Sequence, residues 1–162
     1  FTHHSRLGFV YFAQLNNLLR KDVITEAQKN SLLLSVKSIS TKMKSDAYQV
    51  KLGKKSLSSF LDIYGHIRAG NYNLSSSNLK NNLEFTELLV NNSEPQDENI
   101  SLQKVIFSNI DKYFELNNIP YTASAWVEMF QTAIATRENS KFYYTKGIDG
   151  ILNEIDLSLI HI

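Results

Sequence analysis

One segment of the sequence gathers side chains that could bind an anion or a carbonyl-rich ligand. It runs from Tyr64 to Leu74 and reads Tyr-Gly-His-Ile-Arg-Ala-Gly-Asn-Tyr-Asn-Leu. Its glycines allow sharp turns of the backbone, and His66 and Arg68 carry hydrogen-bond donors. The same two side chains could instead satisfy carbonyl groups at a helix end and hold two lobes together. The segment offers Tyr64, His66, Arg68 and Tyr72 as candidates for ligand binding or an interdomain contact.

A second, cationic segment runs from Thr136 to Thr145. On a helix, Arg137 and Lys141 would share one face, where two like charges repel by about 0.2–0.5 kcal/mol. We therefore expect an acidic group nearby. Glu138 could supply part of that charge, and a ligand phosphate or a carboxylate of the other lobe could supply the rest. An internal set of salt bridges is the alternative. We also expect residues 64–70 to dock onto the cationic face at 137–145.

The composition excludes several classes of function. The 17 Lys and Arg residues nearly balance the 16 Asp and Glu residues, which argues against a nucleic-acid partner. The chain has no cysteine, so disulfides, thiolate metal sites and cysteine nucleophiles are excluded. Glycine-rich phosphate loops and the common hydrolase and zinc motifs are absent. His3 and His4 are adjacent and would diverge on a helix. We predict no catalytic residue, no metal site and no cofactor in these 162 residues.

The elements that must position these segments are helices. Apolar residues recur every three or four positions, and no convincing strand alternation appears outside residues 141–145. A capping box at Thr25 starts a long helix with one apolar stripe from Leu32 to Val50. Gly65 sits where a helix-ending glycine would take a left-handed conformation, and Gly147 is expected to break the last long helix, with Asp149 capping a short one after it. The predicted helices cover residues 7–20, 25–51, 56–64, 83–90, 101–117 and 122–145, and a short additional helix is expected at 148–155.

These patterns predict an all-α fold, an irregular bundle of about six helices with one long loop after the third helix. Residues 1–90 would form a helical lobe that includes the loop at 66–82. A polar linker at 91–99 would join it to a second lobe, residues 100–162, packed on the first. Both ends of the sequence are apolar-rich, so we expect a fragment of a longer chain whose exposed apolar faces could form a homodimer. The polar interruptions between residues 7 and 19 leave no membrane segment, and we expect a cytoplasmic location.

The two segments together resemble a known family. The run Tyr-Gly-His-x-Arg-x-Gly-x-Tyr at residues 64–72 is similar to Tyr-Gly-His-Leu-Arg-Pro-Gly-Thr-Tyr-Asp in the helical central region of phosphoenolpyruvate synthase and pyruvate phosphate dikinase-like proteins. The run Arg-Glu-Asn-Ser-Lys-Phe-Tyr-Tyr-Thr at 137–145 is similar to the Arg-Glu-x-x-Lys-Phe-x-Phe-Thr that such proteins carry downstream. The wider family includes rifampicin phosphotransferases. Ala69, Asn71 and Asn73 stand where the family pattern has proline, threonine and aspartate, so position 73 carries no charge in this chain.

The resemblance implies a parent chain with an ATP-grasp-like nucleotide-binding domain upstream and a swivelling phosphohistidine domain downstream. ATP and Mg²⁺ are then implied for the parent chain only. His3, His4, His66 and His161 lack the Thr-x-His-Gly-Gly-type setting of the family's catalytic histidine, so none inherits that role. The resemblance thus implies a noncatalytic helical linker or acceptor-binding region of an ATP-dependent phosphotransferase-like protein. The alternative is a free-standing helical module that binds a protein partner through the stripe at residues 32–50.

Overall fold

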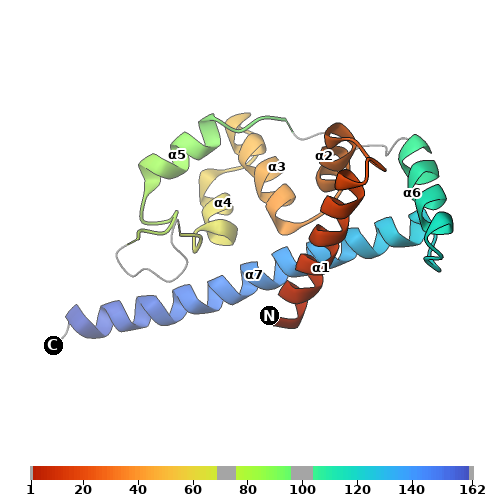
Figure 1. Cartoon of the computed structure of the whole chain (residues 1–162). Helices are drawn as coiled ribbons and strands as arrows, with labels where there is room; N and C mark the ends of the chain where they lie inside the picture. The colour runs from red at the N-terminus through yellow and green to blue at the C-terminus, as the bar shows by residue number, and fades with distance from the viewer. Residues whose placement is uncertain (1, 69–75, 96–103, 161–162) are drawn as a thin grey trace. The chain divides into compact units, whose positions relative to one another are not determined.

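The computed structural model describes residues 2–68, 76–95 and 104–160, and within these ranges the chain is all-α, as predicted (Figure 1). The described residues contain no strand, only an isolated antiparallel bridge between Arg68 and Asn78. Of the long loop expected at 66–82, residues 69–75 lie outside the described ranges, as do residues 96–99 of the expected linker. The helices are α1 (Thr2–Arg20), α2 (Glu26–Leu34), α3 (Ile39–Lys51), α4 (Leu57–Tyr64), α5 (Leu83–Asn91), α6 (Lys104–Leu116) and α7 (Ala123–Ile160).

The single helix predicted for residues 25–51 is two helices. Its start is confirmed, because Thr25 and Gln28 form the expected capping box. The break follows from hydroxyl groups that compete with helical hydrogen bonds. Ser35 donates its hydroxyl to the Leu32 carbonyl at 2.7 Å, and the Ser38 amide donates to the Thr41 hydroxyl at 2.9 Å. The apolar stripe is therefore divided between α2 and α3.

Gly147 does not end the last long helix. Helix α7 continues through it for 38 residues in all, so the predicted helix at 148–155 and the candidate strand at 141–145 are both parts of α7. A glycine inside a helix costs about 1 kcal/mol relative to alanine, which contacts on either side can outweigh. Phe142 and Asp149 are both buried, and they anchor the helix before and after the glycine. Asp149 thus lies within a helix rather than at its start.

Contacts within the chain define two units, and their division differs from the lobes expected at 1–90 and 100–162. Unit 1 comprises residues 1–41 with 97–140, and unit 2 comprises residues 42–96 with 141–162. One division between the units, at residues 96–97, therefore lies within the expected polar linker, and the other two lie inside α3 and α7. Each unit combines residues from both halves of the sequence.

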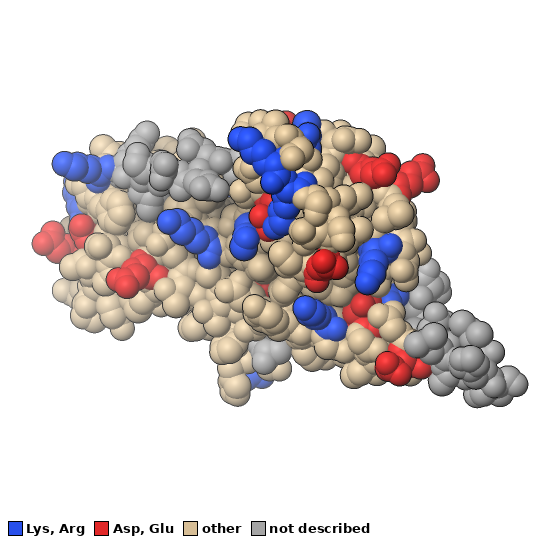
Figure 2. All heavy atoms as spheres, turned by 180° about the vertical axis from the view of Figure 1, so that it is seen from behind, with Lys and Arg blue, Asp and Glu red and all other residues tan. Residues whose placement is uncertain are grey.

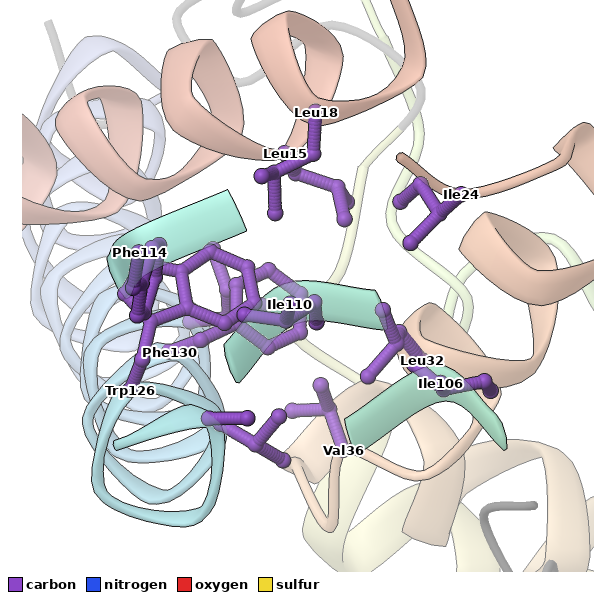
Figure 3. Close-up of a cluster of buried hydrophobic side chains, with 13 residues drawn as sticks. Leu15, Leu18, Ile24, Leu32, Val36, Ile106, Ile110, Phe114, Trp126 and Phe130 are labelled. Carbon is purple, nitrogen blue, oxygen red and sulfur yellow. The ribbon is translucent and has the colours of Figure 1, made fainter. Parts of the chain in front are cut away.

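Unit 1 is built around an apolar core contributed by α1, α2, α6 and the first part of α7 (Figure 3). The Trp126 and Phe130 rings stack at 5.6 Å, and Phe114 meets Trp126 edge-on at 6.3 Å. Full burial of a large apolar side chain stabilises the folded state by about 1.5–3 kcal/mol. The core residues labelled in Figure 3 are Leu15, Leu18, Ile24, Leu32, Val36, Ile106, Ile110, Phe114, Trp126 and Phe130.

Unit 2 has an aromatic core in which α4 meets the second part of α7. Tyr64 packs on Phe60 at 4.8 Å between ring centres and on Phe142 at 6.0 Å. Helix α4 ends at Gly65 as expected, but Gly65 has a φ of −58° and is not left-handed. A glycine fits there because a Cβ would collide with the Leu61 carbonyl oxygen and lie 3.2 Å from the Lys80 Cβ. Glycine is favoured here because neighbouring atoms lie too close for a Cβ, and not because the backbone is left-handed.

Candidate functional site

Arg68, the cation of the first candidate segment, is held by an acidic side chain of α7. Its Nε donates to Asp149 Oδ1 at 2.7 Å, Nη1 donates to the Ser76 carbonyl at 2.8 Å, and Nη2 donates to Asn153 Oδ1 at 3.2 Å. The Arg68 and Asp149 side chains are only 9% and 10% exposed. Asn78 and Asn153 also donate to Asp149, at 3.2 and 3.1 Å. We call Arg68, Ser76, Asn78, Asp149 and Asn153 the Arg68 cluster.

His66 lies beside this cluster, against an aromatic ring of α7. Its ring meets Phe142 edge-on at 4.6 Å, and its Nε2 is buried with no hydrogen-bond partner among the described residues. Burial lowers the pKa of His66 below its ordinary value, and the nearby charge of Asp149 offsets this only in part. The neutral imidazole is therefore the form that this site accommodates.

Tyr64 is hydrogen-bonded to Asp46 of α3, which was not among the predicted site residues. Its hydroxyl donates to Asp46 Oδ2 at 2.7 Å, and Lys55 and Lys42 approach the same oxygen at 2.9 and 3.3 Å. Burial would raise the pKa of Asp46, but hydrogen bonds from Lys55, Tyr64 and Lys42 outweigh it and leave that pKa below its ordinary value. Burial and the Asp46 carboxylate raise the pKa of Tyr64. These groups hold α3 and α4 together.

Arg137 and Glu138 lie in unit 1 and pair with each other. Arg137 Nη1 and Glu138 Oε1 are 2.6 Å apart, and the guanidinium lies 5.0 Å from the centre of the Phe9 ring. Glu138 also accepts from the Ser40 hydroxyl at 3.1 Å, at the start of α3. Glu138 thus supplies an acidic group close to Arg137. Both side chains have internal partners.

The structure brings some of the predicted site residues together and separates others. Tyr64, His66 and Arg68 lie together in unit 2, against α7 between Phe142 and Asn153. The docking surface of residues 64–68 is therefore this stretch of α7, which extends beyond the expected 137–145. Arg137 and Glu138 belong to unit 1, Lys141 is an exposed residue of unit 2, and Tyr72 lies outside the described residues.

A pocket in unit 1 was not foreseen from the sequence. It has a volume of about 280 Å³ and lies between α1, α6, the connection before α7 and the first turns of α7. Its residues come from segments that are far apart in the sequence. Within each helix, apolar and aromatic residues at helical spacing are equally typical of a helix that packs in a core. Tyr121 is the only tyrosine within ten positions of Trp126, so the sequence carried no local signal for the pocket. The lining comprises Tyr11, Gln14, Asn17, Leu18, Tyr113, Phe114, Ile119, Tyr121, Trp126 and Met129.

The described surface carries charges of both signs. Basic and acidic side chains are spread over the face shown in Figure 2. Within the described residues, no three His, Asp or Glu side chains come close enough together to hold a metal ion. No described helix is both long enough and apolar enough to cross a bilayer.

Comparison of the chain with protein-family models, curated proteins and solved structures finds no significant match. The resemblance to the phosphoenolpyruvate synthase group therefore stays a prediction from the two sequence segments. The structure itself has three features that bear on function: the Arg68 cluster, the Arg137–Glu138 pair and the unit 1 pocket.

Proposed function

We propose that this chain is a noncatalytic helical region of a phosphoenolpyruvate-utilising, ATP-dependent phosphotransferase-like protein, where it links the flanking domains and holds an acceptor. The observation that carries the proposal is the use of the Arg68 guanidinium in the Arg68 cluster. The Arg68 guanidinium is 9% exposed and paired with a carboxylate, so it holds the chain segments around it together and is not free to bind a substrate anion. A linker between catalytic domains needs such a fixed shape.

The remaining parts of the proposal follow the resemblance. The flanking nucleotide-binding and phosphohistidine domains would be the partners, and they would hold ATP and Mg²⁺. The proposal keeps the cytoplasmic location and the homodimer expected from the sequence. Exposed apolar side chains of α5, Leu83, Phe85 and Leu88, support an association of this kind. The rival module that binds through residues 32–50 is less well supported, because Leu32, Val36 and Ala47 are buried.

The test compares this chain with the polypeptide encoded by its full reading frame. We expect the chain alone to give no ATP-dependent phosphorylation of pyruvate or another acceptor, and the full polypeptide to give it. Release of AMP or ADP and the appearance of phosphorylated product would be followed by ³¹P NMR. A full reading frame that encodes no neighbouring domains, or turnover by the chain alone, would contradict the proposal.

A further inference from the structure

The unit 1 pocket has the features of a binding site for a small neutral molecule. Its volume of about 280 Å³ is close to the lower end of the range of ligand pockets, about 300–1,000 Å³. Five of its ten lining residues are aromatic, which is typical of such sites. We propose that it binds a neutral sugar ring, as a monosaccharide or a simple glycoside.

The charge of the lining excludes anions from the proposal. None of the ten lining residues is Lys, Arg, His, Asp or Glu. An anion moved from water into such a pocket would lose hydration without gaining a counter-charge, which is costly. Pyruvate, phosphoenolpyruvate and sugar phosphates are therefore poor ligands for this pocket, whereas a neutral molecule avoids the larger cost of desolvating a charge.

The hydrogen-bonding groups of the lining suit hydroxyl groups. The indole N–H of Trp126 can only donate, and it donates to Gln14 Oε1 at 2.8 Å. This bond fixes the orientation of the Gln14 amide, so its NH₂ group is left as a donor. The hydroxyls of Tyr11, Tyr113 and Tyr121 can each donate and accept. A sugar hydroxyl also does both, and it therefore matches these groups better than a pure acceptor does.

The tyrosine rings supply the apolar surface that the C–H faces of a sugar ring need. Tyr11 and Tyr113 are partly buried, and Tyr121 is 55% exposed in the connection before α7. A tyrosine offers an apolar ring with a polar tip, so packing and hydrogen bonding can act on the same ligand. Trp126, 4% exposed and stacked on Phe130, forms the wall behind them. Figure 3 shows Trp126 and Phe130 among the core side chains.

The proposal that the pocket binds a neutral sugar is inferred from unit 1 alone. If that sugar is also the acceptor of the phosphotransferase, this second step rests on the proposed function. The two can fail separately. A full polypeptide without phosphotransfer activity would remove the proposed function and leave sugar binding in place. A full polypeptide that phosphorylates an acceptor, while the chain binds no neutral sugar, would remove only the present inference.

The experiment uses the fluorescence of Trp126, which is the only tryptophan of the 162-residue chain and reports on the pocket directly. The chain is titrated with glucose, N-acetylglucosamine and methyl glucoside, and in parallel with glucose 6-phosphate, pyruvate and phosphoenolpyruvate. We expect a saturable change with at least one neutral sugar and at least tenfold weaker binding of the anions. No saturation with any neutral sugar, or equal or tighter binding of the anions, would overturn the inference.

Variants locate the binding in the pocket. Gln14→Glu keeps an acceptor for the Trp126 N–H but removes the amide donor and adds a negative charge, and we expect at least a tenfold loss of sugar affinity. We expect a similar loss for Tyr121→Leu. The matched control is Tyr143→Leu, a 68% exposed tyrosine of unit 2, which should bind sugar like the unaltered chain. Unchanged affinity in both pocket variants, with normal circular dichroism, would overturn the assignment to this pocket.

Discussion

At the scale of single residues, Arg68 and Asp149 form a buried ion pair in unit 2. The guanidinium presents several donors in a fixed planar fork, and the carboxylate is acceptor-only. Each is about nine-tenths buried, and the neighbouring Asn78 and Asn153 amides satisfy the remaining carboxylate positions. A buried ion pair of this kind gains little net stability over an apolar pair, but it is costly to break on one side only.

We therefore predict that Arg68→Met destabilises the chain by about 3–5 kcal/mol, because Asp149 is left as a buried charge without its cation. Chemical unfolding followed by circular dichroism would measure this loss. In the full polypeptide, the remaining folded fraction should retain its turnover. Loss of turnover at an unchanged melting temperature would instead show that Arg68 acts on a substrate.

The double variant Arg68→Met with Asp149→Leu is the matched control. It removes both charges, so much of the stability lost in Arg68→Met should return. A double variant that is as unstable as the sum of the two single variants would show that the contact between the two side chains is not the cause.

The sequence indicated Arg68 as a candidate but could not identify its partner. The glycines and the imidazole around it marked residues 64–70 as a turn with unusual chemistry. Asp149 lies 81 positions away and looked like the cap of a short helix. Local patterns identify a residue that needs a partner, whereas the choice among distant carboxylates depends on how α7 packs.

At the scale of elements, the helix starts that could be predicted are those with a local cause. Thr25 and Ser56 accept hydrogen bonds from amides three residues ahead, as their types suggest. The division of α2 from α3 and the passage of α7 through Gly147 depend on tertiary contacts. Propensity alone is too weak to decide either point, because a single glycine shifts the balance by about 1 kcal/mol.

Two glycines in helices should respond in opposite ways to alanine. At Gly8 of α1, a Cβ would collide with Arg137 Cδ and lie 3.1 Å from Arg137 Cβ, whereas a Cβ at Gly147 would have no neighbour within 4 Å. We predict that Gly8→Ala destabilises the chain by about 1–2 kcal/mol, since overpacking costs more than the gain in helix propensity. Gly147→Ala should stabilise it by about 0.5–1 kcal/mol.

The two variants serve as controls for each other, because both place the same methyl group inside a helix. Urea unfolding of both at one pH would give the two changes in free energy. An equal gain in stability from both would mean that α1 does not approach Arg137 closely.

At the scale of the whole molecule, the chain is divided between the two units at three places, of which only the one at residues 96–97 lies in the predicted linker. The polar run at 91–99 has the composition of a linker, but residues on both sides of it contribute to each unit. The fold class was predictable because amphipathic periodicity is local. The division into units and the pocket were not, because both depend on contacts such as Gln14 with Trp126, 112 positions apart.

The stability of the whole chain should depend on pH in a way that reflects unit 2. The pKa of His66 is lowered from an ordinary value of 6.5, so the folded state binds this proton less readily than the unfolded state. Its contribution is complete above about pH 6.5 and is lost as pH falls through the folded pKa. We predict that the melting temperature falls between pH 7 and pH 5, before most carboxylates begin to protonate.

His66→Phe separates this effect from other titrations, because phenylalanine keeps a ring against Phe142 but binds no proton. We expect its melting temperature to change much less between pH 7 and pH 5 than that of the unaltered chain. The charged groups that act on His66, Asp149 and Lys146 of α7, remain in place in this variant. Asp46, whose pKa is also lowered, should add a second loss as pH falls below about 3.8. Equal slopes above pH 5 in both proteins would show that His66 is as readily protonated in the folded chain as in the unfolded one.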